Sequence, residues 1–176
     1  MPETNSFSKP EEIISQLDLR DNLEAADFGC GNGYYSIPLA KLMPQGKVYA
    51  LDVVKETLEA VNSQAKLEGI NNIETVHCNL EIPGASKLAD DSVDSVLMRN
   101  ILFQSQKKSA IIKEANRVLK PGGQLVLIEW IPGASLAPKQ GWLISKQEAQ
   151  QLIEQAGLTL DKELTIDNQH YGLVFN

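Results

Sequence analysis

The stretch AADFGCGNGYY, residues 25–35, places three glycines at every second position behind an aspartate. A short apolar run ends at Phe28 and a helix-like segment starts near Tyr34, so the glycines occupy a turn between a strand and a helix. Such a turn gathers backbone N–H groups and the positive end of a helix dipole. Residues 29–33 therefore predict a site for an anionic or polar ligand, although glycines could also serve only a tight turn.

Short β-branched runs alternate with amphipathic stretches on both sides of this turn, from residue 24 to about residue 156. This alternation is typical of a parallel sheet that is covered by helices on both faces. Apolar residues at helical spacing predict the helices between the strands. We expect strands at residues 25–28, 47–51, 73–77, 92–98 and 124–130, and helices at residues 10–17 and 34–43 and around residues 58–65, 111–119 and 149–156.

The last part of the chain predicts two further strands, residues 159–165 and 171–175. These strands are too close in sequence for a crossover, so they form a hairpin and the last strand is antiparallel. The predicted fold class is α/β, with a doubly wound sheet of seven strands. At 176 residues we expect one domain, residues 1–176, in which residues 1–23 form an N-terminal helical segment.

Local signals support the helix boundaries. Ser145 with Glu148, and Ser8 with Glu11, match the spacing of a capping box. Glycine after residue 156 and the KPGG run at residues 120–123 are typical of segments that follow a helix.

The composition excludes several classes of protein. The net charge of −7 gives no positive field for nucleic acid or an anionic membrane. Cys30 and Cys78 form no CxxC pair and have no histidine at ligand spacing, so we expect buried thiols, no metal and no disulfide. Residues 1–12 lack a leader pattern, and no apolar stretch approaches membrane-spanning length. We expect a cytoplasmic protein.

Two acidic residues indicate the kind of ligand. Asp52 follows Gly29 at nearly the spacing at which an acid binds ribose hydroxyls in βαβ nucleotide folds, although it could also cap the next helix. A dinucleotide fingerprint would need glycine at position 34, which is Tyr34. Asp27 would repel a pyrophosphate but suits an ammonium and a sulfonium. These residues favour S-adenosylmethionine over NAD.

Together these features resemble the class I S-adenosylmethionine-dependent methyltransferases, of the small-molecule type found in the methyltransferase domain of ubiquinone and menaquinone biosynthesis enzymes. The RVLKPGGQLVL run, residues 117–127, is the most specific marker. The resemblance implies a Rossmann-like sheet. It extends over EAADFGCGNG (24–33), SVDSVLMRNILF (92–103), IIKEANRVLKPGGQLVLIEW (111–130), SKQEAQQLIEQAGL (145–158) and HYGLVF (170–175).

The resemblance also implies roles in cofactor binding. The glycine turn would receive the methionine part of S-adenosylmethionine, Asp52 would bind the ribose and Val53 would pack on the adenine. Asn79 stands where the family has an aspartate for the adenine amino group, and its uncharged oxygen is a weaker acceptor. The implied cofactor-binding residues are Asp27, Gly29, Gly31, Asn32, Gly33, Asp52, Val53, Asn79, Leu80 and Arg99.

Methyl transfer is an in-line displacement at a carbon that the sulfonium already activates. The protein therefore needs chiefly to align and desolvate the acceptor, and a general base is optional. We find no catalytic triad, and the catalytic residues stay open among Arg99, Asn100, His170 and Tyr171. A lone histidine such as His170 is more often structural than a general base. Substrate contacts are expected at the carboxyl ends of the strands, from Asn100, Phe103, Gln104, Glu129, Trp130 and Trp142.

Two other functions stay open at this point. One is a non-catalytic partner or sensor that binds S-adenosylmethionine, and the other is a nicotinamide-dependent oxidoreductase, which Asp27 and Tyr34 disfavour. Residues 1–23 offer little material to cover a substrate pocket. We therefore expect a pocket for a small-molecule methyl acceptor that is either open or completed by a second copy in a homodimer.

Overall fold

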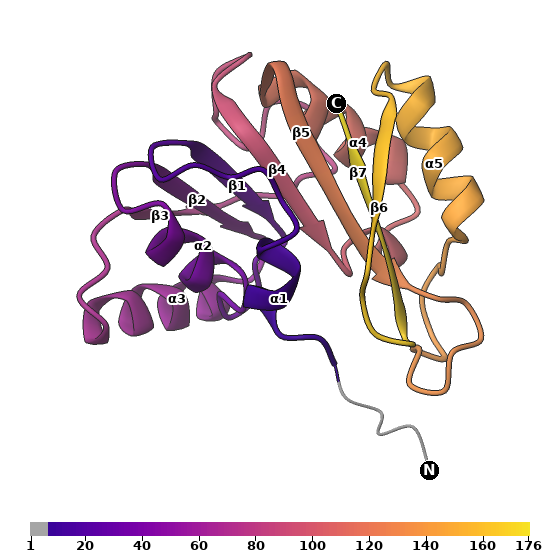
Figure 1. Ribbon diagram of the computed structural model, residues 1–176, viewed down its shortest axis with the longest axis horizontal. Coiled ribbons are helices and arrows are strands. Elements are labelled where there is room, and N and C mark those ends of the chain that lie inside the picture. Colours follow the sequence, from indigo (N-terminus) through magenta and orange to yellow (C-terminus); the bar gives the residue numbers. More distant parts are fainter. Residues whose placement is uncertain (1–6) are drawn as a thin grey trace.

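The computed structural model describes residues 7–176, and these form a seven-stranded sheet with helices on both faces (Figure 1). Residues 1–6, part of the expected N-terminal segment, lie outside the described residues. The strands are β1 (Glu24–Phe28), β2 (Lys47–Asp52), β3 (Ile73–His77), β4 (Val93–Arg99), β5 (Leu119–Trp130), β6 (Leu160–Leu164) and β7 (His170–Phe175). The helices are α1 (Pro10–Ile14), α2 (Ser36–Leu42), α3 (Lys55–Leu67), the 3₁₀ turn η1 (Leu102–Gln104), α4 (Lys108–Val118) and α5 (Lys146–Gln155).

The strand order is β3-β2-β1-β4-β5-β7-β6. Strands β1 to β5 pair in parallel, whereas β7 pairs antiparallel with both β5 and β6, which confirms the predicted fold class. Strand β5 begins at Leu119 rather than residue 124, because Leu119 pairs with Val93 across an irregularity in the ladder. The connections reverse direction between β1 and β4, and open α/β sheets bind ligands at the carboxyl ends of such strands.

Two apolar layers hold the helices on the sheet. On one face, Leu39 of α2 packs in the same buried cluster as Val126 of β5, and α3 packs beside α2 on β2 and β3. On the other face, Ile112 of α4 and Ile153 of α5 pack in the same cluster as Leu127 of β5. The alternation of buried side chains along β5 thus places successive residues on opposite faces.

The helix boundaries confirm part of the predictions. The Ser145 hydroxyl accepts a hydrogen bond from Glu148 N–H, and Ser145 N–H donates to the Glu148 carboxylate at 3.0 Å, so the predicted capping box starts α5. Gly157 follows α5 in the left-handed region at φ 102°. Helix α1 is shorter than the predicted range 10–17 and ends at Ile14.

The predicted capping box at Ser8 and Glu11 is wrong, because α1 begins later. Lys9 is extended, with φ −71° and ψ 146°, as sterics favour for a residue that precedes proline. Pro10 is then the first helical residue, and Lys9 N–H donates to the Glu12 carboxylate at 3.1 Å. The steric restriction that Pro10 places on Lys9 therefore determines where α1 begins.

Gly33 allows the turn after β1 to approach α3. Its φ of +83° lies in the left-handed region, and a Cβ added there would lie 3.0 Å from Val61 Cγ2 and 3.3 Å from Ile37 Cγ1. A side chain at this position would therefore meet both backbone strain and a tightly packed neighbour.

We expect Gly33→Ala to lower the free energy of unfolding by about 2 to 4 kcal/mol, as the sum of left-handed backbone strain and overpacking. Gly69→Ala is the matched control, because Gly69 has a φ of +68° and its added Cβ would meet no atom within 4 Å. The control should lose about 1 to 2 kcal/mol. Urea unfolding followed by circular dichroism measures both losses, and equal losses would contradict the packing role of Gly33.

Candidate functional site

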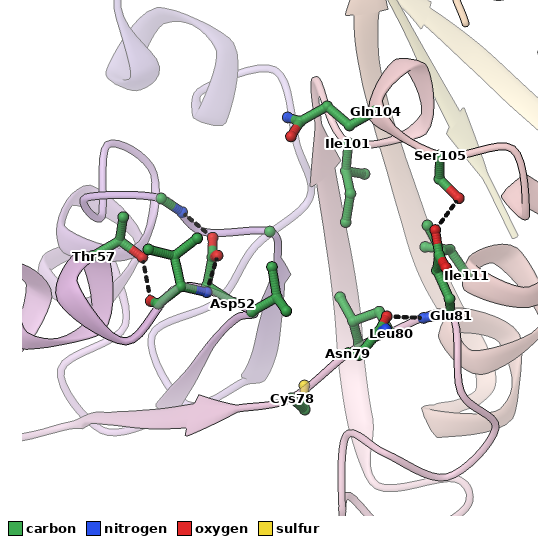
Figure 2. Close-up of a pocket in the computed structure, with 14 residues that line it drawn as sticks. Asp52, Thr57, Cys78, Asn79, Leu80, Glu81, Ile101, Gln104, Ser105 and Ile111 are labelled. Atoms are coloured by element: carbon green, nitrogen blue, oxygen red, sulfur yellow. Dashed lines mark hydrogen bonds between the residues drawn. The ribbon is translucent and has the colours of Figure 1, made fainter. Parts of the chain in front are cut away.

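A cleft of about 360 Å³ lies at the carboxyl ends of β1 to β4, a volume within the usual range for small-molecule sites. Figure 2 shows Asp52 and Thr57 on one side of this cleft and Ile101, Gln104 and Ile111 on the other. The predicted cofactor-binding residues that line the cleft are Gly29, Gly31, Asp52, Val53, Asn79 and Leu80.

The three glycines of the turn have different neighbours. Gly29 has a φ of +73°, and a Cβ added there would lie 2.9 Å from Ile101 Cδ1. A Cβ added at Gly33 would contact Val61 of α3. Gly31 also has a left-handed φ, +52°, but an added Cβ there would meet no protein atom within 4 Å. Gly31 lines the cleft, so a side chain there would project into ligand space rather than into protein.

Asp52 joins the glycine turn to the end of β2. One carboxylate oxygen accepts the N–H of Gly31 at 2.9 Å, and the other accepts the N–H of Val54 at 2.9 Å (Figure 2). Val54 is the N-cap of α3, so the alternative role of Asp52 as the helix cap is wrong. Each carboxylate oxygen has further lone pairs, which suit two neighbouring hydroxyls of a ribose.

The far end of the cleft has apolar walls and one amide. Val53 exposes 60% of its surface, and the largely buried Leu80 also lines the cleft. The side-chain oxygen of Asn79 accepts the N–H of Glu81 at 3.0 Å, which fixes the orientation of the amide. A flat heterocycle would thus find apolar contacts and a held amide at this end.

Other predicted cofactor-binding residues lie outside the lining of the cleft. Asp27 is 2% exposed and accepts a 2.6 Å hydrogen bond from the Ser36 hydroxyl, and burial raises its pKa to about 6. The carboxylate is therefore still largely ionised at pH 7, but it is buried against Ser36 and does not line the cleft as the sequence suggested. The Arg99 guanidinium stands over the rings of Tyr34 and Tyr35, 5.2 and 5.7 Å from their centroids. Asn32 and Gly33 also lie outside the lining.

A second group of predicted residues meets beside the cleft. The side-chain nitrogen of Asn100 lies 3.2 Å from His170 Nε2, and His170 Nδ1 lies 2.8 Å from the Asp167 carboxylate. The imidazole also stacks on Trp130, with ring centroids 4.1 Å apart. The antiparallel pairing of Trp130 with His170 brings these residues together from distant parts of the chain.

Two of the predicted catalytic and substrate residues are buried in the protein. The Tyr171 hydroxyl donates to the carbonyl of Ile144 at 3.0 Å, and burial raises its pKa. Glu129 is fully buried, and one of its oxygens accepts the N–H of Leu102 at 2.6 Å. Burial raises the pKa of Glu129 to about 7. Both residues hold neighbouring loops in place.

The remaining residues that were predicted to contact the substrate lie in different parts of the structure. Gln104 lines the cleft, and its amide donates to the carbonyl of Asn100 at 2.7 Å. Trp142 is 48% exposed but lines a different pocket, beside Lys108 and α5. The carbonyl of Phe103 accepts the N–H of Trp142 at 2.7 Å, so Phe103 anchors that loop.

Sequence reasoning missed several residues that line the cleft or its surroundings. Ile101 and Ser105 follow β4, where strand order alone predicts ligand contacts. Asp167 carried no signal, because its partner His170 becomes important only through the contact with Asn100. The other cleft residues missed are Val54, Thr57, Cys78, Glu81 and Ile111.

A family model described as a methyltransferase domain matches residues 19–164. The chain belongs to the class I S-adenosylmethionine-dependent methyltransferase family. The cofactor of this family is S-adenosylmethionine, and the described residues fit it: an open turn at Gly31, a carboxylate at Asp52 and apolar walls at Val53 and Leu80.

Relatives of known sequence include two bacterial demethylmenaquinone methyltransferases. The protein from Geobacillus kaustophilus (strain HTA426) is 30% identical over 121 residues, which are 68% of this chain and 50% of that protein. The protein from Bacillus velezensis is 33% identical over 121 residues, with the same shares covered. The chain thus spans about half the length of these curated relatives.

The fold is also similar to a solved SAM-dependent methyltransferase from Aquifex aeolicus. The two share 25% identity and a TM-score of 0.81, over 94% of this chain and 88% of that one. Within residues 7–176 there is no group of three or more His, Cys, Asp or Glu side chains that could hold a metal ion. No helix in the described part of the chain is long and apolar enough to cross a membrane.

We expect Asp52→Asn to weaken the binding of S-adenosylhomocysteine by about 1.5 to 3 kcal/mol, because an amide nitrogen would face one of the two N–H donors and the charge-assisted bonds to ribose would be lost. Titration calorimetry measures this change. Asp161→Asn, on the exposed edge of β6, is the control and should bind as the native chain does. Unchanged affinity in Asp52→Asn would contradict the ribose role.

We expect Asp27→Asn to stabilise the chain at pH 7 in the absence of cofactor. The pKa of Asp27 rises from an ordinary value of 3.8 to about 6, so the folded state holds the proton more tightly than the unfolded state. The associated stability is complete below pH about 4 and is lost as the pH rises past about 6. Unfolding free energies of both chains from pH 4 to 7 should converge at the acid end, and a constant difference would contradict this linkage.

Proposed function

We propose that this chain is a methyltransferase that transfers the methyl group of S-adenosylmethionine to a small, flat acceptor of the hydroxylated aromatic type. The observation that carries the proposal is the position of Asn100 between the cofactor cleft and the aromatic side chains of His170 and Trp130. Its carbonyl accepts a hydrogen bond from Gln104 of the cleft, and its side chain contacts His170, which stacks on Trp130. Asn100 therefore links a residue of the cofactor cleft, Gln104, to the aromatic pair of His170 and Trp130.

The aromatic surface suits a ring better than a flexible polar chain. Phe7 packs edge-on against Trp130 at 6.0 Å, and Tyr34 packs edge-on against Tyr35 at 5.6 Å. Arg99 lies over the two tyrosine rings and has no carboxylate within ion-pair distance among residues 7–176. Aromatic groups bind flat rings by stacking and burial of apolar area, and a nearby guanidinium favours electron-rich oxygen.

The bound cofactor would supply a methyl carbon that is already activated by the sulfonium. The chain's own residues then act by position: the glycine turn and Asp52 hold one partner, while Trp130 and its neighbours exclude water around the other. An electron-rich carbon or oxygen would take the methyl group first and would then lose its ring or hydroxyl proton to water, so no residue has to remove that proton before the transfer. This explains why the site needs no catalytic triad.

The demethylmenaquinone methyltransferases among the relatives support a ring-bearing acceptor. We also propose that residues 1–176 form a single methyltransferase domain that works in the cytoplasm. The competing function is a sensor or partner that binds the cofactor without turnover.

The test is methyl transfer from labelled S-adenosylmethionine to 1,4-naphthalenediol under reducing conditions, and to a small-molecule cell extract. We expect labelled product from the native chain and from Gly69→Ala, and none from Gly31→Asp, because its side chain would project into the cleft. If the native chain binds S-adenosylhomocysteine but transfers no methyl group to either sample, the proposed enzyme activity is rejected in favour of a sensor that binds the cofactor without turnover.

A further inference from the structure

Carboxylates stand in the cofactor cleft at the ends of two neighbouring strands. Among the described residues that line the cleft, Asp52 and Glu81 are the acidic ones. Asp52 ends β2, Glu81 closely follows β3, and β3 lies next to β2 in the sheet. The strand order β3-β2-β1 therefore leaves the end of β3 for the base of a cofactor whose methionine part occupies the glycine turn and whose ribose binds Asp52.

Asn79 offers such a base a donor rather than the acceptor that the sequence suggested. Its side-chain oxygen accepts the N–H of Glu81 at 3.0 Å (Figure 2). Reversing the amide would bring two N–H donors together, so the oxygen has to face the Glu81 N–H. The other position of the amide, where an aspartate would carry its second oxygen, is a nitrogen without a hydrogen bond to residues 7–176. Because Asn79 is exposed and lines the cleft, this N–H₂ is the group that is free to bind a ligand.

The carboxylate of Glu81 is fixed in place and still open to the cleft. Its Oε1 accepts the Ser105 hydroxyl at 2.6 Å, and Ser105 Oγ itself accepts the N–H of Lys107 at 2.8 Å, so the serine proton is directed at Glu81 (Figure 2). Glu81 Oε2 has no hydrogen bond within the described part of the chain. The Lys107 ammonium lies 3.8 Å from this oxygen, on a side chain that is 69% exposed, and such a pair is weak. The Glu81 side chain is 30% exposed, which leaves Oε2 accessible.

The two side chains complement one edge of adenine. Adenine carries an amino group, which needs an acceptor, beside a ring nitrogen, which needs a donor. Glu81 supplies a free carboxylate oxygen and Asn79 a free N–H₂, and the hydrogen bond between Asn79 and Glu81 N–H keeps the two residues together. A charged carboxylate is also a stronger acceptor than an amide oxygen. An amino group of a ligand therefore gains more from Glu81 than from Asn79.

We propose that Glu81 binds the amino group of the cofactor's adenine, while the side-chain nitrogen of Asn79 donates to the ring nitrogen beside that group. Ser105 is a positioning residue, because it acts through the carboxylate of Glu81. The pair replaces the single aspartate that the family has at position 79. The inference concerns the cofactor and not the methyl acceptor, so it goes beyond the function proposed above and does not depend on it.

The test compares S-adenosylhomocysteine with its analogue in which purine replaces adenine, so that only the amino group is missing. Titration calorimetry on the full chain should give about 10- to 100-fold tighter binding of S-adenosylhomocysteine, as expected for a hydrogen bond to a charged group. Glu81→Ala should bind both ligands equally, with the affinity that the native chain has for the purine analogue. Glu59→Ala, exposed on α3 and outside the lining of the cleft, is the matched control and should keep the native preference.

Two further variants separate the roles of the neighbouring residues. Asn79→Ser should weaken both ligands by a similar factor and keep the preference, because the ring nitrogen is present in both and a serine oxygen can still accept the N–H of Glu81. Ser105→Ala should reduce the preference severalfold without changing the affinity for the purine analogue, since the carboxylate of Glu81 loses its anchor.

The outcomes also separate this inference from the proposed function. Equal binding of the two ligands by the native chain, no binding of either, or a preference that survives in Glu81→Ala would overturn it. A preference that is lost in Asn79→Ser but kept in Glu81→Ala would assign the amino group to the oxygen of Asn79 instead. Equal weakening of both ligands by Glu81→Ala would show a structural role only and would also overturn the inference. The expected preferences in a chain that transfers no methyl group would reject the proposed function and leave the role of Glu81 in place.

Discussion

The hydrogen bond from Gly31 N–H to Asp52 is the interaction on which the site depends. It ties the turn after β1 to the end of β2, and a glycine is required because the backbone there is left-handed while an added side chain would enter the cleft. With Gly29 packed against Ile101 and Gly33 against α3, the turn has one conformation. The cleft is thus formed by the protein before any ligand contributes.

The sheet order extends this site to the other half of the chain. Strand β4 lies between β1 and β5, so residues that follow β4 face the glycine turn on one side and the end of β5 on the other. Asn100 occupies that position and connects with His170 because β7 runs antiparallel beside β5. A parallel β7 would place its first residue at the opposite edge of the sheet. The antiparallel strand therefore brings His170 beside Asn100 at the carboxyl ends of the parallel strands.

The sequence was informative wherever a local rule determines structure. Periodicity and hairpin spacing predicted the sheet, and the spacing of Asp52 from Gly29 predicted its place in the cleft. It was not informative where the direction of a side chain matters. The spacing of Asp27 from Gly29 does not reveal whether its carboxylate faces the cleft or the protein interior. The packing of α2 against β1 turns this carboxylate toward Ser36.

Long-range contacts were beyond local rules for the same reason. Trp130 is the last residue of β5 and Trp142 lies in the loop that follows, and this loop carries Trp142 to a pocket beside α5 while Trp130 remains on the sheet. The link between Asn100 and His170 needs the register of two strand pairs at once. At Lys9, in contrast, a local rule existed, and the steric effect of Pro10 outweighed the capping pattern at Ser8.

The insertion of β7 between β5 and β6 has a consequence for the order of assembly. Strand β6 has its only ladder with β7 among the described strands, so it stays without a partner until the hairpin forms and docks on β5. The pocket for the cofactor draws on β1 to β4, whereas the histidine and its aspartate arrive with the hairpin. Because pairings between distant segments form slowly, a nascent molecule would form the cofactor cleft first and the contact between Asn100 and His170 last.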